Sequence, residues 1–182
     1  MTSISLDGID EKFRDKVSVQ DYSKKPQIDG VKILDINKFV GEDGHFSELI
    51  HFNERGECEE FPGFKVAQVN RAKVLPHAIK AWHIHFKQDE IWYVYPEEHL
   101  FVGLFDVREG SKTKEVSMKV VLGGKSRLLF IPKGIAHGCA NVTDNPANIF
   151  YFVSQKFDIK DPDEKRLPWD ILGKDFWEAK KE

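Results

Sequence analysis

The chain has 182 residues and a mass of 21.0 kDa, a length typical of one domain. Its net charge of −3 and pI of about 6.2 exclude the strongly basic surface of most nucleic-acid-binding proteins. No apolar run approaches the roughly 18 residues of a membrane span, and the N-terminus lacks the apolar core of a signal peptide. With only two cysteines, Cys58 and Cys139, we expect free thiols and a cytoplasmic protein.

Turn signals divide the chain into an N-terminal arm and one domain. Residues 1–30 are polar and mixed in charge, and Pro26 and Gly30 interrupt regular structure there. We expect this arm to lie on the surface or to pack on a partner subunit. Over residues 31–182, short apolar segments alternate with turns, which predicts a single domain of many strands. The predicted strands cover residues 31–40, 45–52, 64–70, 80–86, 91–95, 100–107, 116–122, 127–131, 138–142 and 147–153, and the predicted helix covers 169–180.

Many short strands with little helix predict an all-β fold. Aromatic residues make up 12% of the chain, and strands favour aromatic and β-branched side chains. Two packed antiparallel sheets accommodate about ten such strands as a double-sheet jelly roll. We therefore expect a jelly-roll barrel, also called a double-stranded β-helix, followed by a short C-terminal helix.

A pair of histidines and a glutamate stand close together between residues 81 and 94. His83 and His85 are separated by one residue, and Glu90 follows at the start of the next predicted strand. Alternate side chains of a strand share a face, so we expect both imidazoles to point the same way. This spacing makes the segment a candidate site for catalysis or for a metal.

A second segment, residues 131–141, adds a third histidine. Pro132 and Gly134 predict a tight turn, His137 begins the returning strand, and Asn141 follows four residues later. Together with the first segment, this pattern resembles the two motifs of the cupin superfamily. In metal-binding cupins three histidines and a glutamate hold one divalent transition-metal ion, a donor set that suits such ions. The corresponding residues here are His83, His85, Glu90 and His137.

A longer resemblance, over about residues 31–177, is to the dTDP-4-dehydrorhamnose 3,5-epimerase family, whose members are themselves cupins. The spacing of fifteen residues from Gln68 to His83 equals that between the family's conserved glutamine and its catalytic histidine. Tyr151 matches the family's catalytic tyrosine if one residue is inserted in the preceding turn. The other matching segments are residues 42–48, 132–138 and 167–170.

This resemblance implies an epimerase or isomerase that needs no cofactor and acts on a nucleotide-linked 4-keto-6-deoxy sugar, as a homodimer. His83 would be the base and Tyr151 the acid in proton transfer beside the ketone, with His137 near the sugar or pyrophosphate. The implied substrate-binding residues are Gln68 and Asn70 at the nucleobase, Lys80 in place of a family arginine, and Glu48 from a partner subunit.

Departures from the family pattern leave two alternatives open. Glu90 stands where the family has the lysine that stabilises the enolate, and a bare carboxylate there would oppose the reaction. One alternative is a metal-dependent cupin, an oxygenase or isomerase, in which Glu90 is a ligand and Tyr151 is the base. The other is a sugar-binding cupin without catalysis, because the aspartate that pairs with the family's catalytic histidine has no clear match in this chain.

Overall fold

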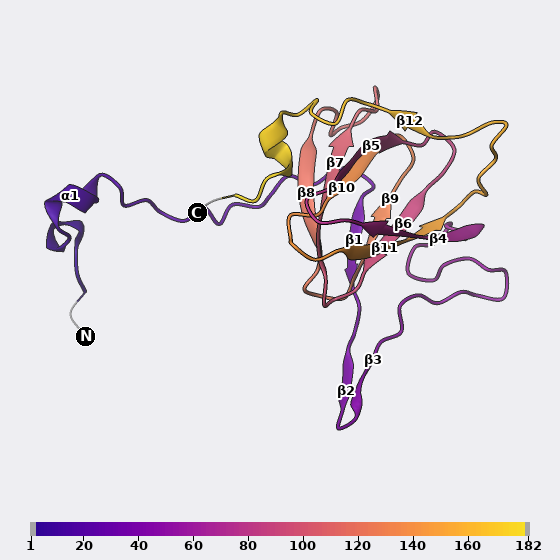
Figure 1. Cartoon of the computed structure of the whole chain (residues 1–182), viewed down its shortest axis with the longest axis horizontal. Helices are drawn as coiled ribbons and strands as arrows, with labels where there is room; N and C mark the ends of the chain where they lie inside the picture. The colour runs from indigo at the N-terminus through magenta and orange to yellow at the C-terminus, as the bar shows by residue number, and fades with distance from the viewer. Residues whose placement is uncertain (1–2, 181–182) are drawn as a thin grey trace.

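The computed structural model describes residues 3–180, and its regular secondary structure consists almost entirely of antiparallel strands (Figure 1). One five-stranded sheet has the order β1-β9-β6-β11-β4, and the other has the order β12-β5-β10-β7-β8. A separate hairpin, β2-β3, projects from the barrel (Figure 1). The elements are η1 (Leu6–Gly8), α1 (Glu11–Arg14), β1 (Lys32–Asp35), β2 (Phe39–Gly41), β3 (Gly44–Phe46), β4 (Gln68–Val74), β5 (Ile79–Ile84), β6 (Glu90–Val94), β7 (His99–Asp106), β8 (Ser117–Gly123), β9 (Arg127–Ile131), β10 (Ile135–Ala140), β11 (Ala147–Val153), β12 (Lys165–Arg166) and η2 (Lys174–Trp177).

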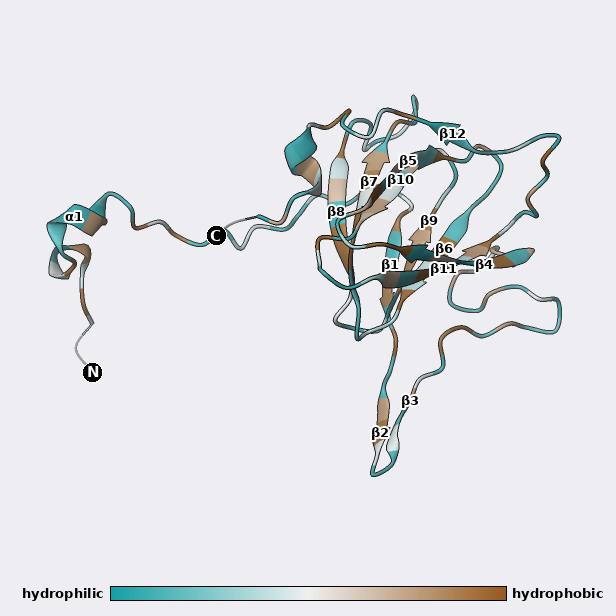
Figure 2. Cartoon of the chain, in the orientation of Figure 1, coloured by the Kyte–Doolittle hydropathy of each residue, from teal (hydrophilic) through white to brown (hydrophobic). Residues whose placement is uncertain are grey.

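The two sheets enclose an apolar interior. Strands of both sheets contribute to it, with Leu129 and Ile149 from the first and Leu104 and Ile135 from the second, all fully buried. Burial of such side chains is the dominant favourable term in folding. The hydropathy colouring shows hydrophobic stretches along the strands of both sheets (Figure 2). The prediction of an all-β jelly roll is confirmed.

The outer face of the first sheet is covered by the segment between β3 and β4. Phe61 and Phe64 of this segment form an apolar cluster with Ile91 and Tyr93 of β6. The prediction of a strand over 45–52 is wrong beyond Phe46, where β3 ends. The following residues pack across the sheet instead of pairing along its edge, because their apolar side chains join this cluster.

The outer face of the second sheet is covered by the C-terminal segment. Trp82 of β5 is fully buried there, and its ring centroid lies 4.7 Å from that of Trp177. The indole N–H groups of both tryptophans donate to the carbonyl of Trp169, at 3.2 Å and 2.9 Å. The prediction of a helix over 169–180 is wrong, since only the 3-10 turn η2 forms. Gly173, with φ of +85°, interrupts the chain before η2, and docking on Trp82 fixes the tail in an irregular path.

The N-terminal segment with η1 and α1 extends away from the barrel (Figure 1). Contact with the barrel begins at Ile28, a buried member of the interior cluster, slightly before the expected boundary at residue 31. The guanidinium of Arg108 donates to the carbonyl of Asp29 at 2.7 Å and thereby ties this end of the arm to the barrel. Among the helices of residues 3–180, none has the length and apolar character needed to span a membrane.

Candidate active site

A cavity of about 420 Å³ is lined by residues of both sheets. β5 and the turn that follows it bring His83 and His85 from the second sheet, and β4, β6 and β11 supply the opposite wall from the first. His137 of β10 lies behind this lining and is only 2% exposed. The predicted site residues that line the cavity are Gln68, Asn70, Lys80, His83, His85, Glu90 and Tyr151.

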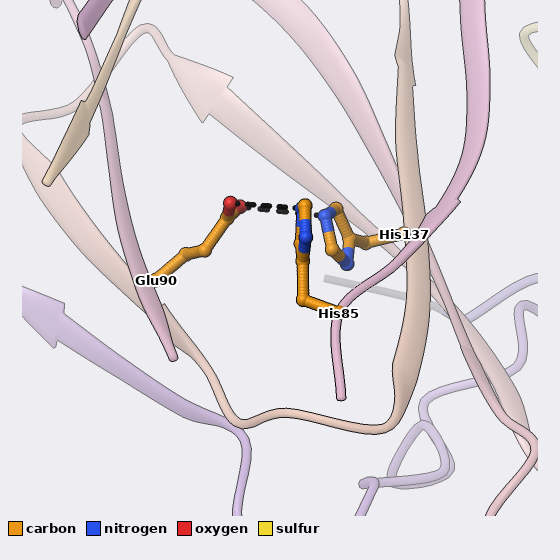
Figure 3. A group of neighbouring side chains, drawn as sticks. All are labelled: His85, Glu90 and His137. Carbon is orange, nitrogen blue, oxygen red and sulfur yellow. Dashed lines mark ion pairs between the residues drawn. The ribbon is translucent and has the colours of Figure 1, made fainter. Parts of the chain in front are cut away.

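The carboxylate of Glu90 is buried at the centre of a polar cluster (Figure 3). Its Oε1 lies 3.2 Å from Nε2 of His85, and its Oε2 lies 3.3 Å from Nε2 of His137. Oε1 also accepts a hydrogen bond from the Gln88 amide at 2.6 Å, and Oε2 accepts one from the Trp92 indole at 2.5 Å. Glu90 is therefore not a bare carboxylate, because each of its oxygens has two polar neighbours.

Backbone carbonyls fix how the two imidazoles of this cluster are oriented. His85 donates from Nδ1 to the carbonyl of Asp163, and His137 donates from Nδ1 to that of Ile135 at 2.9 Å. The hydrogen bond at Nδ1 of each imidazole sets the orientation of the ring and the protonation of its other nitrogen. In this orientation the Nε2 atoms of His85 and His137 both face Glu90. Burial alone would raise the pKa of Glu90, but the neighbouring imidazoles of His137 and His85 lower it. Burial likewise opposes protonation of His85, yet hydrogen bonding and attraction to Glu90 raise its pKa.

His83 differs from the other two histidines because its Nε2 does not face Glu90, whereas Nε2 of His137, which likewise has no hydrogen-bond partner among the described residues, lies 3.3 Å from Oε2 of Glu90. His83 lies opposite His137 in the β5–β10 register, with ring centroids 6.0 Å apart. Within the described chain its buried Nε2 has no hydrogen-bond partner. Burial, followed by the charges of His137 and Arg166, lowers the pKa of His83 from 6.5 to about 4. At neutral pH this imidazole is therefore a free base beside the cavity.

Tyr151 is held on the first sheet, in β11, against Trp92 of β6. The two rings meet edge to face with centroids 5.0 Å apart. Burial, and then the proximity of Cys139 and Glu90, raises the pKa of the Tyr151 phenol. The phenol therefore keeps its proton at neutral pH and is available as an acid.

The expected substrate-binding residues are only partly brought together. The Gln68 amide donates to Oδ1 of Asn70 at 2.6 Å, and Oε1 of Gln68 accepts the Phe157 backbone N–H at 3.0 Å. These bonds preset the Gln68 and Asn70 amides on β4, at one wall of the cavity. Glu48 lies outside this cavity, in a separate depression where its carboxylate is 3.5 Å from Nε2 of His51.

Comparison with known proteins agrees with this geometry. The family model described as dTDP-4-dehydrorhamnose 3,5-epimerase matches residues 25–171. Spore coat polysaccharide biosynthesis protein SpsL of Bacillus subtilis (strain 168) is 40% identical over 144 residues, which cover 79% of this chain and 91% of SpsL. The chain belongs to the dTDP-4-dehydrorhamnose 3,5-epimerase family. The probable low-salt glycan biosynthesis epimerase Agl13 of Haloferax volcanii is a more distant relative, 27% identical over 80% of this chain and 90% of its own.

Solved structures with the same fold include enzymes of this epimerase family. NovW, a 4-keto-6-deoxy sugar epimerase from Streptomyces spheroides, superposes with a TM-score of 0.70 at 21% identity, covering 85% of this chain and 78% of NovW. The RmlC enzyme of Legionella pneumophila, in complex with dTDP-4-keto-L-rhamnose, gives 0.66 at 25% identity, covering 79% and 75%. The jelly-roll fold and the family expected from the sequence are therefore both confirmed.

The donor atoms of His85, Glu90 and His137 also fit a divalent metal ion. One ligand atom from each lies within 4.8 Å of the others, and the carbonyl bonds at Nδ1 are the usual support for ligating imidazoles. His83, the fourth ligand of the set expected from the sequence, is not in this group.

Sequence reasoning missed two residues that shape this epimerase site. Trp92 donates to Glu90, and the hydrogen bond between them at strand positions i and i+2 follows from their shared face. Asp163 lies in the irregular segment after β11 and has no motif around it. No signal in the sequence connects it with His85.

The lowered pKa of His83 predicts an unusual pH dependence for this epimerase. With His83 as the catalytic base, the role proposed for it below, a pKa of about 4 keeps it neutral down to about pH 5, so kcat/KM is expected to lose less than about half of its value between pH 7 and pH 5. A histidine with the ordinary pKa of 6.5 would lose most of its basic form over this range. Steady-state rates across pH 4.5–8 test this, and a half-maximal rate near pH 6.5 would contradict it.

Proposed function

We propose that the protein is an epimerase of polysaccharide biosynthesis that moves protons at the carbons beside the ketone of a dTDP-linked 4-keto-6-deoxy sugar. One observation carries this proposal: the free imidazole of His83 and the protonated phenol of Tyr151 line the same cavity from opposite sheets. Such a pair suits removal of a proton from one face of a sugar and its return to the other. The names of SpsL, Agl13 and NovW, and the dTDP-sugar bound to the Legionella enzyme, support the substrate class.

In the proposed reaction Nε2 of His83 takes the proton from the carbon beside the ketone. The electron pair of that C–H bond moves toward the ketone oxygen and forms an enolate. The phenol of Tyr151 then gives its proton to the other face of the same carbon, and exchange with solvent restores both side chains. No cofactor is required, because both proton transfers use side chains of the chain itself. Glu90 does not oppose the enolate as a bare carboxylate would, since imidazoles, an amide and an indole surround it.

The nucleotide part of the substrate is proposed to bind along β4. Gln68 and Asn70 would contact the nucleobase, Lys80 would face the diphosphate, and His137 would lie beneath the sugar. Glu48 would complete the site from the partner subunit of a homodimer, which is supported by its position outside its own cavity. The two free thiols support a cytoplasmic location.

Replacing Tyr151 with phenylalanine is expected to separate the two proton transfers. The variant should lower the rate of epimerised product formation by about 10²- to 10³-fold, because the phenolic proton is lost. Removal of the substrate proton by His83 should remain measurable as deuterium incorporation from D₂O. NMR of the dTDP-4-keto-6-deoxy sugar during turnover reports both quantities. Loss of deuterium incorporation in parallel with product would contradict the assignment of Tyr151 as the acid.

A metal-dependent reaction of this cupin is the second candidate, and the convergence of three donor atoms favours it. His85, Glu90 and His137 would hold the divalent ion, which when bound would polarise the ketone as a Lewis acid. His83 lies outside this group and would remain available to move a proton. Elemental analysis of protein purified without an affinity tag or chelator tests this candidate. About one equivalent of a transition metal per chain would support it, and no metal after soaking would remove it.

A further inference from the structure

One wall of the cavity is formed by an irregular segment rather than by a strand. This segment, residues 154–164, joins β11 to β12 and supplies several of the residues that line the cavity. Irregular segments are held in position by individual hydrogen bonds, because they lack the regular backbone hydrogen bonds that join neighbouring strands. The bonds that hold this wall therefore determine the geometry of the site.

Asp163 makes more of the hydrogen bonds that attach this segment to the barrel than any other residue of the segment. Its carboxylate accepts three consecutive backbone N–H groups, those of Phe86 at 2.9 Å, Lys87 at 2.7 Å and Gln88 at 3.1 Å. Successive N–H groups that converge in this way form a strong site for a negative charge. The three residues lie between His85 and Glu90, so the carboxylate of Asp163 fixes the turn that joins these two members of the cluster.

The backbone of Asp163 makes a second, independent contact with the site. Its carbonyl accepts the Nδ1–H of His85, and this bond leaves Nε2 of His85 3.2 Å from Glu90. The carboxylate and the carbonyl of one residue therefore act together. The carboxylate anchors the chain, and the anchored carbonyl sets which way the imidazole faces.

We propose that Asp163 is a positioning residue of the active site, which orients the His85 imidazole toward Glu90 and holds the 154–164 wall against the turn at residues 86–88. The catalytic consequence rests on the proposed function, whereas the orientation of His85 does not. A side chain displaced by about 1 Å from its productive geometry can lower a rate by about 100-fold. The expected signature is thus a loss of kcat, with smaller changes in the binding of dTDP.

The test uses the full chain with Asp163→Ala and Asp163→Asn. In Asp163→Asn one oxygen can still accept the Phe86 N–H, but the amide N–H₂ would face the N–H groups of Lys87 and Gln88. The matched control is Asp21→Asn, whose carboxylate accepts the backbone N–H of Ser23 at 2.8 Å, in the N-terminal arm. Both Asp163 variants are expected to lower kcat about 10- to 100-fold, with Kd for dTDP changed less than about threefold. The control should match the wild type.

A second readout reports on His85 directly and needs no substrate. In ¹H–¹⁵N NMR spectra the Nδ1 proton of His85 should be protected from exchange with solvent in the wild type, and a His85→Gln variant assigns the signal. This protection should be lost in Asp163→Asn, the milder variant, even if Asp163→Ala does not fold. Retained protection, or a kcat within threefold of the wild type in a folded Asp163 variant, would overturn the proposal. Wild-type inactivity on dTDP-linked keto sugars would instead refute the proposed function and leave the NMR result to decide the role of Asp163.

Discussion

Replacing His83 with asparagine is expected to lower kcat about 10²- to 10⁴-fold, the range that a general base typically contributes. The physical reason is that His83 lines the cavity with a buried Nε2 that has no partner in the described part of the chain, whereas the Nε2 atoms of His85 and His137 lie 3.2 Å and 3.3 Å from the Glu90 carboxylate. Deuterium incorporation into the keto sugar should fall with product formation, because the first proton transfer itself is lost. Stopped-time NMR assays in D₂O measure both.

The matched control for this prediction is His77→Asn. His77 is exposed and its imidazole contacts the Asp144 carboxylate at 3.0 Å, away from the cavity, so its loss should leave kcat unchanged. Asparagine at position 83 keeps a polar side chain, and thermal unfolding should confirm that the variant folds. If His83→Asn keeps more than a tenth of the wild-type rate, another group is the base.

Replacing Glu90 with glutamine is expected to lower the free energy of unfolding by about 3–5 kcal/mol, the usual cost of breaking a buried ion pair from one side. The amide would remove the negative charge beside two buried imidazoles and would direct an N–H₂ group at donors such as the Trp92 indole. Urea unfolding followed by circular dichroism at pH 7 measures the change.

Glu97→Gln serves as the control for this substitution because Glu97 is exposed and belongs to the same hairpin region, between β6 and β7. It should change the free energy of unfolding by no more than about 0.5 kcal/mol. A Glu90→Gln protein as stable as the wild type would show that the carboxylate is not paired as the structure indicates. Elemental analysis of the same variant also tests the metal candidate, since full metal occupancy without Glu90 would exclude it as a ligand.

The sequence predicted the fold well because its signals are local. Alternation of apolar residues and regularly spaced turns identify strands such as β7, β9 and β11, and these signals need no knowledge of distant contacts. The prediction of a helix over residues 169–180 is wrong because distant contacts determine the conformation of this segment. Its path is decided by Trp82, which is separated from Trp169 by 87 residues, and not by the helical pattern of the tail itself.

The residues of the site that belong to sequence motifs were predicted, whereas those that only long-range contacts bring to the site were not. The His-x-His pair and the Pro-x-Gly turn predicted that His83, His85 and His137 lie together, and the structure places His83 and His85 at one cavity with His137 buried behind its lining. They could not show that His83 lies outside the group of donor atoms formed by His85, Glu90 and His137. Asp163 is 78 residues from His85, and only the path of an irregular segment brings them together.

The pairing of β1 with β9 has a consequence for how this enzyme is made in the cell. The ladder joins Lys32 to Phe130, so β1 must wait for nearly a hundred further residues to leave the ribosome before its partner exists. Proteins dominated by such distant pairings fold slowly, and their unpaired strands are exposed to association in the meantime. The site matures later still, because Tyr151 and Asp163 are synthesised after β9. A nascent chain therefore lacks a complete site until residue 163 has left the ribosome, and β1 stays unpaired until β9 has been made.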